Sequence, residues 1–246
     1  MRVLILTVAG LSTRFSESLG YEVIKCIYHE KSFSESLLFR MLQRHEMFDK
    51  IVIVGGYRGD ELKETIDKEF AAIADKIRYV INPFYSEYGS GYSLFVGYEA
   101  IKNEPVKELV FVEGDLFFDD ESFLRIVYSK KDVITYTNQP VLSNKSFAFY
   151  LDVEDKIHYI FDTAHNLLMI EEPFKAIYNS GQVWKFTKFE LVKRIFEQMS
   201  EYEKQGTNLI PINKYFNCLI QEQYETIGFK EWINCNTVDD FRASLG

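Results

Sequence analysis

The sequence contains few cysteines and histidines, and neither type is spaced as in a metal or redox site. Its three cysteines, Cys26, Cys218 and Cys235, form no C-x-x-C pair and leave an odd count. A disulfide framework and a structural zinc site are therefore not expected. The four histidines show no spacing typical of a metal site or a catalytic triad. We expect these residues to lie in the core or at the surface.

Long apolar runs and an excess of basic residues are also missing. No run of about 18 apolar residues is present, so a membrane-spanning helix is not expected. The N-terminus lacks a basic region and a small-residue cleavage site, which predicts a cytoplasmic protein. The 28 Lys and Arg are outnumbered by 37 Asp and Glu, and the net charge is −9. This charge argues against a nucleic-acid partner, and positive charge at any phosphate site must be local.

The composition is that of a globular domain. The chain has 246 residues, 47% of them hydrophobic and 16% aromatic, which is ample for a core. No internal repeat, low-complexity tract or linker interrupts it. We therefore expect a single domain over residues 1–246, and the sequence leaves the oligomeric state open.

Strand and helix patterns alternate through the first half of the chain. Strands are predicted at residues 3–6, 51–54, 77–81 and 109–112, and helices at residues 37–42, 60–70 and 120–127 and from about Tyr92. Alternation at this spacing predicts βαβ units, a mainly parallel sheet and a ligand site at the carboxyl ends of the strands.

From residue 132 the pattern changes to closely spaced strands. These are predicted at residues 133–136, 147–151, 157–160, 224–229 and 232–235, with helices at 189–199, at 209–220 and after residue 236. The expected fold is α/β, with a Rossmann-like mainly parallel (mixed) sheet flanked by helices and a smaller antiparallel sheet grafted onto it.

The first loop has the composition of a phosphate-binding loop. The apolar run at 3–6 stops at the small-residue segment of residues 9–13, which is followed by Arg14 and later by Lys25. Small residues let backbone N–H groups approach a ligand closely, and the two cations could hold the phosphates of a nucleoside triphosphate. The alternative is an ordinary βα turn with a surface Arg and Lys.

This segment resembles the A-A-G-x-G-[ST]-R…P-K signature of the nucleotidyltransferases that open sugar-nucleotide and phosphocholine activation pathways. Ser12 stands where the family has its second loop Gly, and Ile24 replaces the Pro before Lys25. The resemblance implies catalytic roles for Arg14 and Lys25. It also implies nucleotide contacts from the loop residues Ala9, Gly10, Leu11, Ser12 and Thr13.

A second loop precedes the helix that begins near Tyr92. Gly89, Ser90 and Gly91 would offer exposed amides and a hydroxyl there. Residues 92–94, Tyr-Ser-Leu, resemble phosphocholine cytidylyltransferases, whereas Gly89-Ser90 is similar to the G-T of sugar-1-phosphate uridylyltransferases. Because this loop holds part of the base in the family, these three residues are expected to bind nucleotide, with the base left open. A plain helix N-cap is the alternative.

Two further segments point to a metal. Asp115 follows a buried strand, where a carboxylate is costly unless it meets a cation or donors. Gly114-Asp115 resembles the family's G-D, whose Asp binds the catalytic Mg²⁺. The segment after Cys235 resembles V-D-T-x-x-D, with Asn236 at the position of the second metal ligand. The resemblance thus implies Mg²⁺ on Asp115 and Asn236, while both could instead be helix caps.

Two short motifs resemble acceptor-binding segments of sugar-1-phosphate nucleotidyltransferases. Glu171-Glu172-Pro173 is similar to E-K-P, with Glu172 in place of the Lys near the acceptor phosphate, and the tripeptide at 179–181 is similar to N-T-G. Glu171 and Asn179 are therefore expected to bind the acceptor. The alternatives are a solvated strand edge for Glu171 and a turn for Asn179.

The resemblance covers nearly the whole chain, with its motifs in the family's order. It implies a Mg²⁺-dependent nucleotidyltransferase that moves a nucleoside monophosphate from an NTP to a small phosphorylated acceptor and releases pyrophosphate. Residues 1–131 would form the nucleotide-binding half and residues 132–246 the acceptor-binding half. CTP with phosphocholine, a phosphonate or a similar acceptor is the first choice.

Two alternatives stay open at this point. One is a UTP-dependent sugar-1-phosphate uridylyltransferase, favoured by Gly89-Ser90, Glu171, Asn179 and Asn236. The other is a nucleotide-binding regulatory protein with weakened turnover, since several positions depart from the family pattern: Ser12, Ile24, Glu172 and Asn236.

Overall fold

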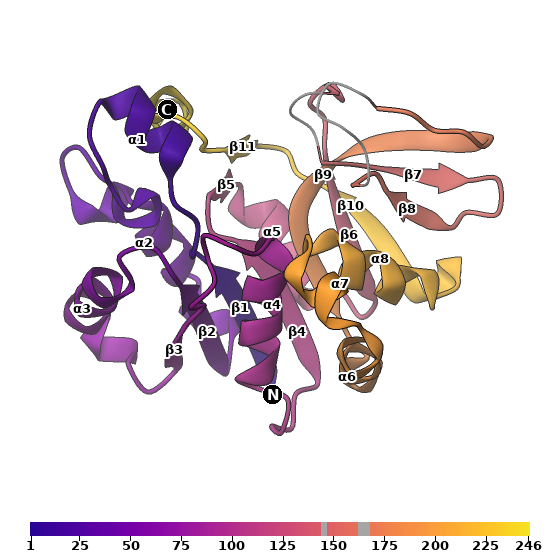
Figure 1. Ribbon diagram of the computed structural model, residues 1–246, viewed down its shortest axis with the longest axis horizontal. Coiled ribbons are helices and arrows are strands. Elements are labelled where there is room, and N and C mark those ends of the chain that lie inside the picture. Colours follow the sequence, from indigo (N-terminus) through magenta and orange to yellow (C-terminus); the bar gives the residue numbers. More distant parts are fainter. Residues whose placement is uncertain (144–146, 162–167) are drawn as a thin grey trace.

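A computed structural model describes residues 1–143, 147–161 and 168–246 (Figure 1). The strands are β1 (Arg2–Thr7), β2 (Lys50–Gly55), β3 (Ile77–Ile81), β4 (Glu108–Glu113), β5 (Leu116–Phe118), β6 (Asp132–Thr137), β7 (Ala148–Asp152), β8 (Ile157–Tyr159), β9 (Phe174–Phe186), β10 (Tyr224–Gly228) and β11 (Trp232–Asn234). The α-helices are α1 (Thr13–Leu19), α2 (Leu37–Leu42), α3 (Gly59–Glu69), α4 (Ser90–Glu99), α5 (Asp120–Tyr128), α6 (Phe189–Gln198), α7 (Glu201–Gln205), α8 (Leu209–Asn217) and α9 (Val238–Ala243). Short 3-10 turns are η1 (Lys25–Ile27), η2 (Phe33–Glu35), η3 (His45–Met47), η4 (Ala71–Ile73) and η5 (Gln221–Gln223).

One mixed sheet runs through the molecule in the order β10-β6-β9-β4-β1-β2-β3, with β7 beside β9 and β8 beside β7. The pairs β4–β1, β1–β2, β2–β3 and β10–β6 are parallel, whereas β9 is antiparallel to both β4 and β6. A separate antiparallel ribbon joins β5 to β11. The predicted fold class, an α/β fold with a mainly parallel mixed sheet and a small antiparallel sheet, is confirmed.

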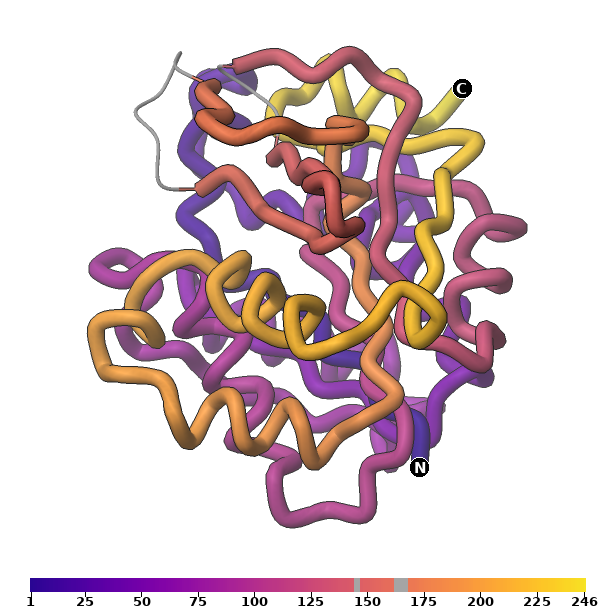
Figure 2. The backbone as a smooth tube through the Cα atoms, turned by 90° about the vertical axis from the view of Figure 1, so that its right-hand side faces the viewer, coloured from indigo at the N-terminus to yellow at the C-terminus, as the bar shows by residue number. Residues whose placement is uncertain are grey.

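Helices cover both faces of the parallel strands, and this explains the continuous apolar runs. In β1, Val3 and Ile5 face the core beneath α4, α6 and α8, while Leu4 and Leu6 face the core beneath α2, α3 and α5. All four side chains are at most 1% exposed. A strand buried on both faces has no polar face and shows no alternation in its sequence. Figure 2 views the molecule from its α6 and α8 side, with the β7 and β8 hairpin above these helices.

The longest strand, β9, is one that the sequence patterns do not predict. It has 13 residues and joins β4 to β6 across the middle of the sheet. The tripeptide at 179–181 looks like a turn in the sequence, yet Ser180 is fully buried within the strand. A Cβ on Gly181 would lie 2.6 Å from Thr135 Oγ1 and 2.7 Å from the Phe229 ring, so only glycine fits there. This position therefore needs glycine because of close packing and not because the chain turns there.

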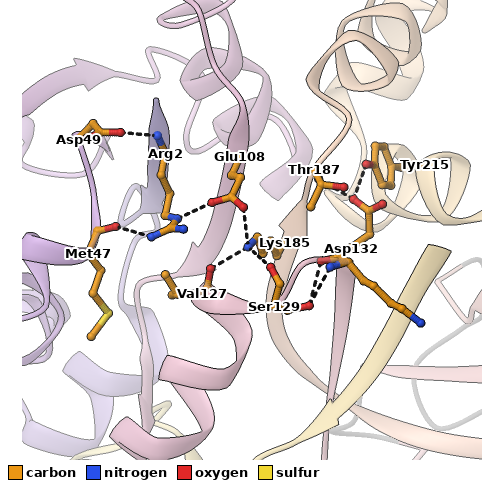
Figure 3. Close-up of polar contacts among 11 residues, drawn as sticks. Arg2, Met47, Asp49, Glu108, Val127, Ser129, Asp132, Lys185, Thr187 and Tyr215 are labelled. Atoms are coloured by element: carbon orange, nitrogen blue, oxygen red, sulfur yellow. Dashed lines mark hydrogen bonds and ion pairs between the residues drawn. The ribbon is translucent and has the colours of Figure 1, made fainter. Parts of the chain in front are cut away.

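A buried polar network lies at the amino-terminal ends of β1 and β4 (Figure 3). Glu108 accepts from Arg2 Nε at 2.6 Å and from Lys185 Nζ at 3.1 Å. The Lys185 ammonium, which is fully buried, also donates to the carbonyls of Val127 and Ser129, at 2.7 Å each. A buried charge needs such partners, and here they fasten β9 to β4 and to the end of α5.

The two chain ends lie on opposite sides of the molecule, with the N-terminus at the amino-terminal ends of the parallel strands and the C-terminus beside α1 (Figures 1 and 2). The last helix, α9, packs beside α1 through Phe15, Val238 and Phe241, which form a small core of their own. Among the described residues, none of the helices has both the length and the apolar character needed to cross a membrane.

Candidate active site

A cavity of about 260 Å³ opens at the carboxyl ends of β1 and β4, where a parallel sheet is expected to bind its ligand. Residues from the first loop, from the turn before α4 and from the end of β4 surround it. Its lining residues are Thr7, Val8, Ala9, Gly10, Ser12, Ile24, Lys25, Cys26, Tyr85, Tyr88, Gly89, Ser90, Ser93, Glu113, Gly114 and Asp115.

Ser12 has a left-handed backbone, with φ 58° and ψ 24°, and it is the N-cap residue of α1. This conformation costs a residue with a Cβ roughly 1–2 kcal/mol, which accounts for glycine at this position in the family's signature. The Ser12 hydroxyl provides a compensating contact, because Ser12 Oγ accepts a hydrogen bond from the backbone N–H of Lys25 at 3.2 Å. Serine in place of glycine thus adds a hydrogen bond between the first loop and Lys25, the residue expected to bind phosphate.

Lys25 and Asp115 form an ion pair inside the cavity, with Lys25 Nζ 2.9 Å from Asp115 Oδ2. Their side chains are 16% and 24% exposed. The other carboxylate oxygen, Asp115 Oδ1, is buried without a hydrogen-bond partner in the described part of the chain. Because a buried acceptor without a partner is unfavourable, this oxygen is open to a cation or a donor.

Asn236 reaches the same region from the far end of the sequence. The β5–β11 ribbon pairs Leu116 with Asn234, and the Cys235 amide donates to the Asp115 carbonyl at 2.8 Å. The Asn236 side chain accepts from Arg14 Nη2 at 2.8 Å. The ribbon therefore ties the residue before Asn236 to the backbone of Asp115, while the Arg14–Asn236 pair is exposed and neither of its residues lines the cavity.

Neither expected metal ligand serves as a helix cap. Asp119 caps α5 by accepting from the Ser122 amide at 2.8 Å. Thr237 caps α9 in a reciprocal capping box with Asp240. These findings exclude the capping alternatives for Asp115 and Asn236.

The residues present fit a hard cation. Asp115 Oδ1 and Asn236 Oδ1 are both oxygen ligands of the kind that Mg²⁺ takes, and one of them has no partner. Within the described ranges, no group of three or more His, Cys, Asp or Glu side chains is placed to hold a metal ion.

Glu113 is a cavity residue that the sequence reasoning missed. Burial, and next the charge of Asp115, raise the pKa of Glu113 to about 8, although a hydrogen bond from Asn208 opposes the shift. That bond joins Asn208 Nδ2 to Glu113 Oε1 at 2.6 Å. The signal in the sequence is a second acidic residue at the end of the apolar run of β4, two positions before Asp115. The cavity residues Tyr85 and Tyr88 were also missed, because nothing distinguishes them from core residues, and Ser93 was noticed only as part of the motif at residues 92–94.

Two of the three amides of the second loop are already hydrogen-bonded within the protein, contrary to expectation. Gly89 N donates to the Gln205 carbonyl at 2.7 Å, and Gly91 N donates to the Gly206 carbonyl at 3.0 Å. A Cβ on Gly89 would lie 2.3 Å from the Gly206 oxygen, so this glycine permits close packing against the segment between α7 and α8. Gly89 and Ser90 do line the cavity, and nucleotide binding by this loop stays a prediction.

Other expected site residues lie outside the cavity lining, among them Arg14, Gly91 and Asn236. Leu11 is 45% exposed, and Thr13 begins α1, which the sequence patterns present as part of a loop. Asn179 is buried in β9 opposite Thr137, and Glu171 is exposed just before that strand. Binding of the acceptor by Glu171 and Asn179 stays a prediction.

Three solved structures have the same fold over almost the full chain. The inositol-1-phosphate CTP transferase from T. maritima superposes with a TM-score of 0.67 at 15% identity, covering 100% of this chain and 95% of that one. The CTP:phosphocholine cytidylyltransferase LicC from Streptococcus pneumoniae gives 0.63 at 18% identity, covering 99% and 97%. A Bacillus anthracis protein assigned as a glucose-1-phosphate thymidylyltransferase gives 0.66 at 12% identity, covering 99% and 94%.

These likenesses establish the fold of the nucleotidyltransferases, as the sequence motifs imply. No curated protein matches the sequence. The model of one protein family, described as "Domain of unknown function (DUF6564)", matches residues 21–245. The chain therefore belongs to the DUF6564 family, and it has the nucleotidyltransferase fold.

Proposed function

We propose that this protein is a nucleotidyltransferase that moves a nucleoside monophosphate from an NTP to a small phosphorylated acceptor and releases pyrophosphate. The observation that carries the proposal is the Lys25–Asp115 ion pair, with its atoms 2.9 Å apart, inside the cavity at the carboxyl ends of β1 and β4. Arg14 pairs with Asn236 at 2.8 Å, and the residue before Asn236 is hydrogen-bonded to the Asp115 carbonyl. A cation and a carboxylate in a cavity, with a second cation on a neighbouring segment, suit a triphosphate with its metal.

In this reaction an acceptor phosphate oxygen attacks the α-phosphorus in line, the bond to the β-phosphate oxygen breaks, and pyrophosphate leaves. The attacking oxygen is already anionic, so no strong general base is needed, and catalysis consists of positioning and charge neutralisation. Arg14 and Lys25 neutralise the triphosphate and the charge of the transition state. When bound by Asp115 and Asn236, Mg²⁺ supplies further neutralisation of phosphate oxygens.

CTP is the preferred donor in this proposal, with phosphocholine, a phosphonate or a similar compound as acceptor. Support comes from the resemblance of residues 92–94 to phosphocholine cytidylyltransferases, and from two structural relatives that are named as CTP-dependent. A UTP-dependent sugar-1-phosphate enzyme is the alternative, supported by Gly89-Ser90. In either case, Glu171→Ala and Asn179→Ala are expected to raise the KM for the acceptor and to leave that for the NTP nearly unchanged.

A second candidate is a nucleotide-binding protein with weak turnover. One observation favours it, because each expected metal ligand already contacts a cation: Asp115 pairs with Lys25, and Asn236 accepts from Arg14.

Pyrophosphate release with each of the four NTPs, tested against phosphocholine, a phosphonate and sugar 1-phosphates in the presence of Mg²⁺, distinguishes these functions. Release with one donor and acceptor pair is the expected result. NTP binding in a thermal-shift assay without release for any pair supports the binding protein. The absence of both contradicts the proposed function.

A further inference from the structure

The Glu113 carboxyl lines the cavity, and the proposed mechanism gives this group no role. Glu113 is the last residue of β4, and its side chain lines the cavity. Asn208, which is 1% exposed, donates from Nδ2 to Glu113 Oε1 at 2.6 Å. Since this contact engages one carboxyl oxygen, the other is available to a ligand. Asn208 therefore acts as a positioning residue for the carboxyl.

Glu113 connects the two regions of the cavity that would hold the ends of a nucleotide. On one side, the Asn208 backbone amide donates to Ser90 Oγ at 3.2 Å, which ties Glu113 through Asn208 to the loop before α4. On the other side, Asp115 follows two residues later and pairs with Lys25. If the base lies by the loop and the phosphates by Lys25, the part of the nucleotide beside Glu113 is the ribose.

The hydrogen-bonding chemistry of the Glu113 carboxyl group favours a ribose hydroxyl over a phosphate as its ligand. Phosphate oxygens are acceptors and carry negative charge, so the Glu113 carboxylate, whose hydrogen bond comes from the neutral Asn208 amide and not from a cation, would repel them. A ribose hydroxyl is a neutral donor, and a carboxyl oxygen accepts from it in either protonation state.

On the basis of the proposed function, we propose that Glu113 accepts a hydrogen bond from the ribose hydroxyls of the bound NTP. The site then selects ribonucleotides over deoxyribonucleotides, because a deoxy analogue leaves the Glu113 oxygen without its donor. An acceptor in the site that is left without its donor weakens binding by roughly ten- to a hundredfold.

The test compares the wild-type affinities for CTP, 2′-deoxy-CTP and 3′-deoxy-CTP by calorimetry with Mg²⁺, and repeats the series with UTP, ATP and GTP. We expect the loss of one hydroxyl or the other to weaken binding by roughly ten- to a hundredfold. Glu113→Ala should lose most of this preference while it binds the deoxy analogue nearly as the wild type does. Glu64→Ala, which changes an exposed glutamate on α3, is the matched control and should keep the preference.

Equal wild-type affinities for CTP and both deoxy analogues would overturn the inference and leave the proposed function standing. A preference that persists in Glu113→Ala would also overturn it, as would a Glu113→Ala variant in which only the acceptor KM changes. No binding of any NTP would overturn the proposed function and this inference together. If Glu113→Ala does not fold, Glu113→Gln is measured in its place. This variant should keep a reduced preference for ribonucleotides, since its amide can donate to a hydroxyl. An unreduced preference in Glu113→Gln would overturn the inference.

Discussion

Lys25 Nζ lies 2.9 Å from Asp115 Oδ2, although 90 positions separate the two residues in the sequence. Lys25 begins η1 after the first loop, and Asp115 follows β4, so the parallel pairing of β1 with β4 brings them to one edge. A partly buried carboxylate without a cation is costly. The pair therefore keeps the cavity near charge balance in the absence of substrate.

Lys25→Ala should lower turnover by roughly a hundredfold, which corresponds to about 3 kcal/mol of lost electrostatic stabilisation. Steady-state pyrophosphate release measures the effect. Lys31→Ala, at an exposed position, is the control and should keep the wild-type rate. A near-normal rate in Lys25→Ala would remove this residue from the reaction.

Asp115→Asn keeps the size of the side chain and removes its charge. We expect Mg²⁺-dependent turnover to fall by at least about a hundredfold, because the expected metal ligand and the partner of Lys25 are weakened together. Circular dichroism and a melting curve should show a folded protein. An unfolded variant would mean that the role of Asp115 is structural.

Asn236→Asp adds one negative charge beside Asp115 at almost constant volume. Because charge in the ligand shell tunes hard-cation affinity, the Mg²⁺ concentration for half-maximal rate should fall several-fold. A Mg²⁺ titration of wild type, Asn236→Asp and the exposed control Asn103→Asp measures this. An unchanged titration curve would mean that Asp115 holds the metal without Asn236.

Glu113 should make stability fall as pH rises. Its pKa is raised from 4.5 to about 8 in the folded protein by burial and by Asp115. Between pH 4.5 and about 8 the folded state keeps the proton that the unfolded state has released. The contribution of this proton to the free energy of unfolding is therefore complete below about pH 4.5 and is lost as pH rises through about 8. Glu113→Gln cannot ionise, so its free energy of unfolding should change less over this range. Parallel curves for wild type and variant, measured by denaturant titration at several pH values, would contradict the assignment.

Lys185→Met should destabilise the fold by about 3–5 kcal/mol, because two buried carbonyls and Glu108 lose their cationic partner. Lys175→Met is a matched control on the same strand, since Lys175 forms an exposed ion pair with Asp155. The control should cost less than about 1 kcal/mol. Denaturant unfolding measures the free energy of unfolding of both variants. Equal losses of stability would show that burial of Lys185 does not determine the cost of its removal.

The sequence by itself determined the parallel half of the fold and much of the site. Continuous apolar runs such as residues 3–6 predict β1, because strands covered on both faces need apolar side chains at every position. The helix at 37–42 begins after Ser36, whose hydroxyl accepts from the Phe39 amide. Loops that follow such strands lie at one edge of a parallel sheet, so Arg14, Lys25 and Asp115 could be singled out from local patterns.

Only the tertiary structure decided which distant groups meet. β9 contains a polar segment at residues 179–181 that looks like a turn, and it becomes part of a strand because β6 pairs with it on one side and β7 on the other. Glu113 and Asn208 are 95 positions apart, and no local pattern signals a contact that the packing of α8 on the sheet creates. Periodicity records which face of an element is buried, whereas the partner of a polar side chain depends on how the elements pack, and so does its pKa.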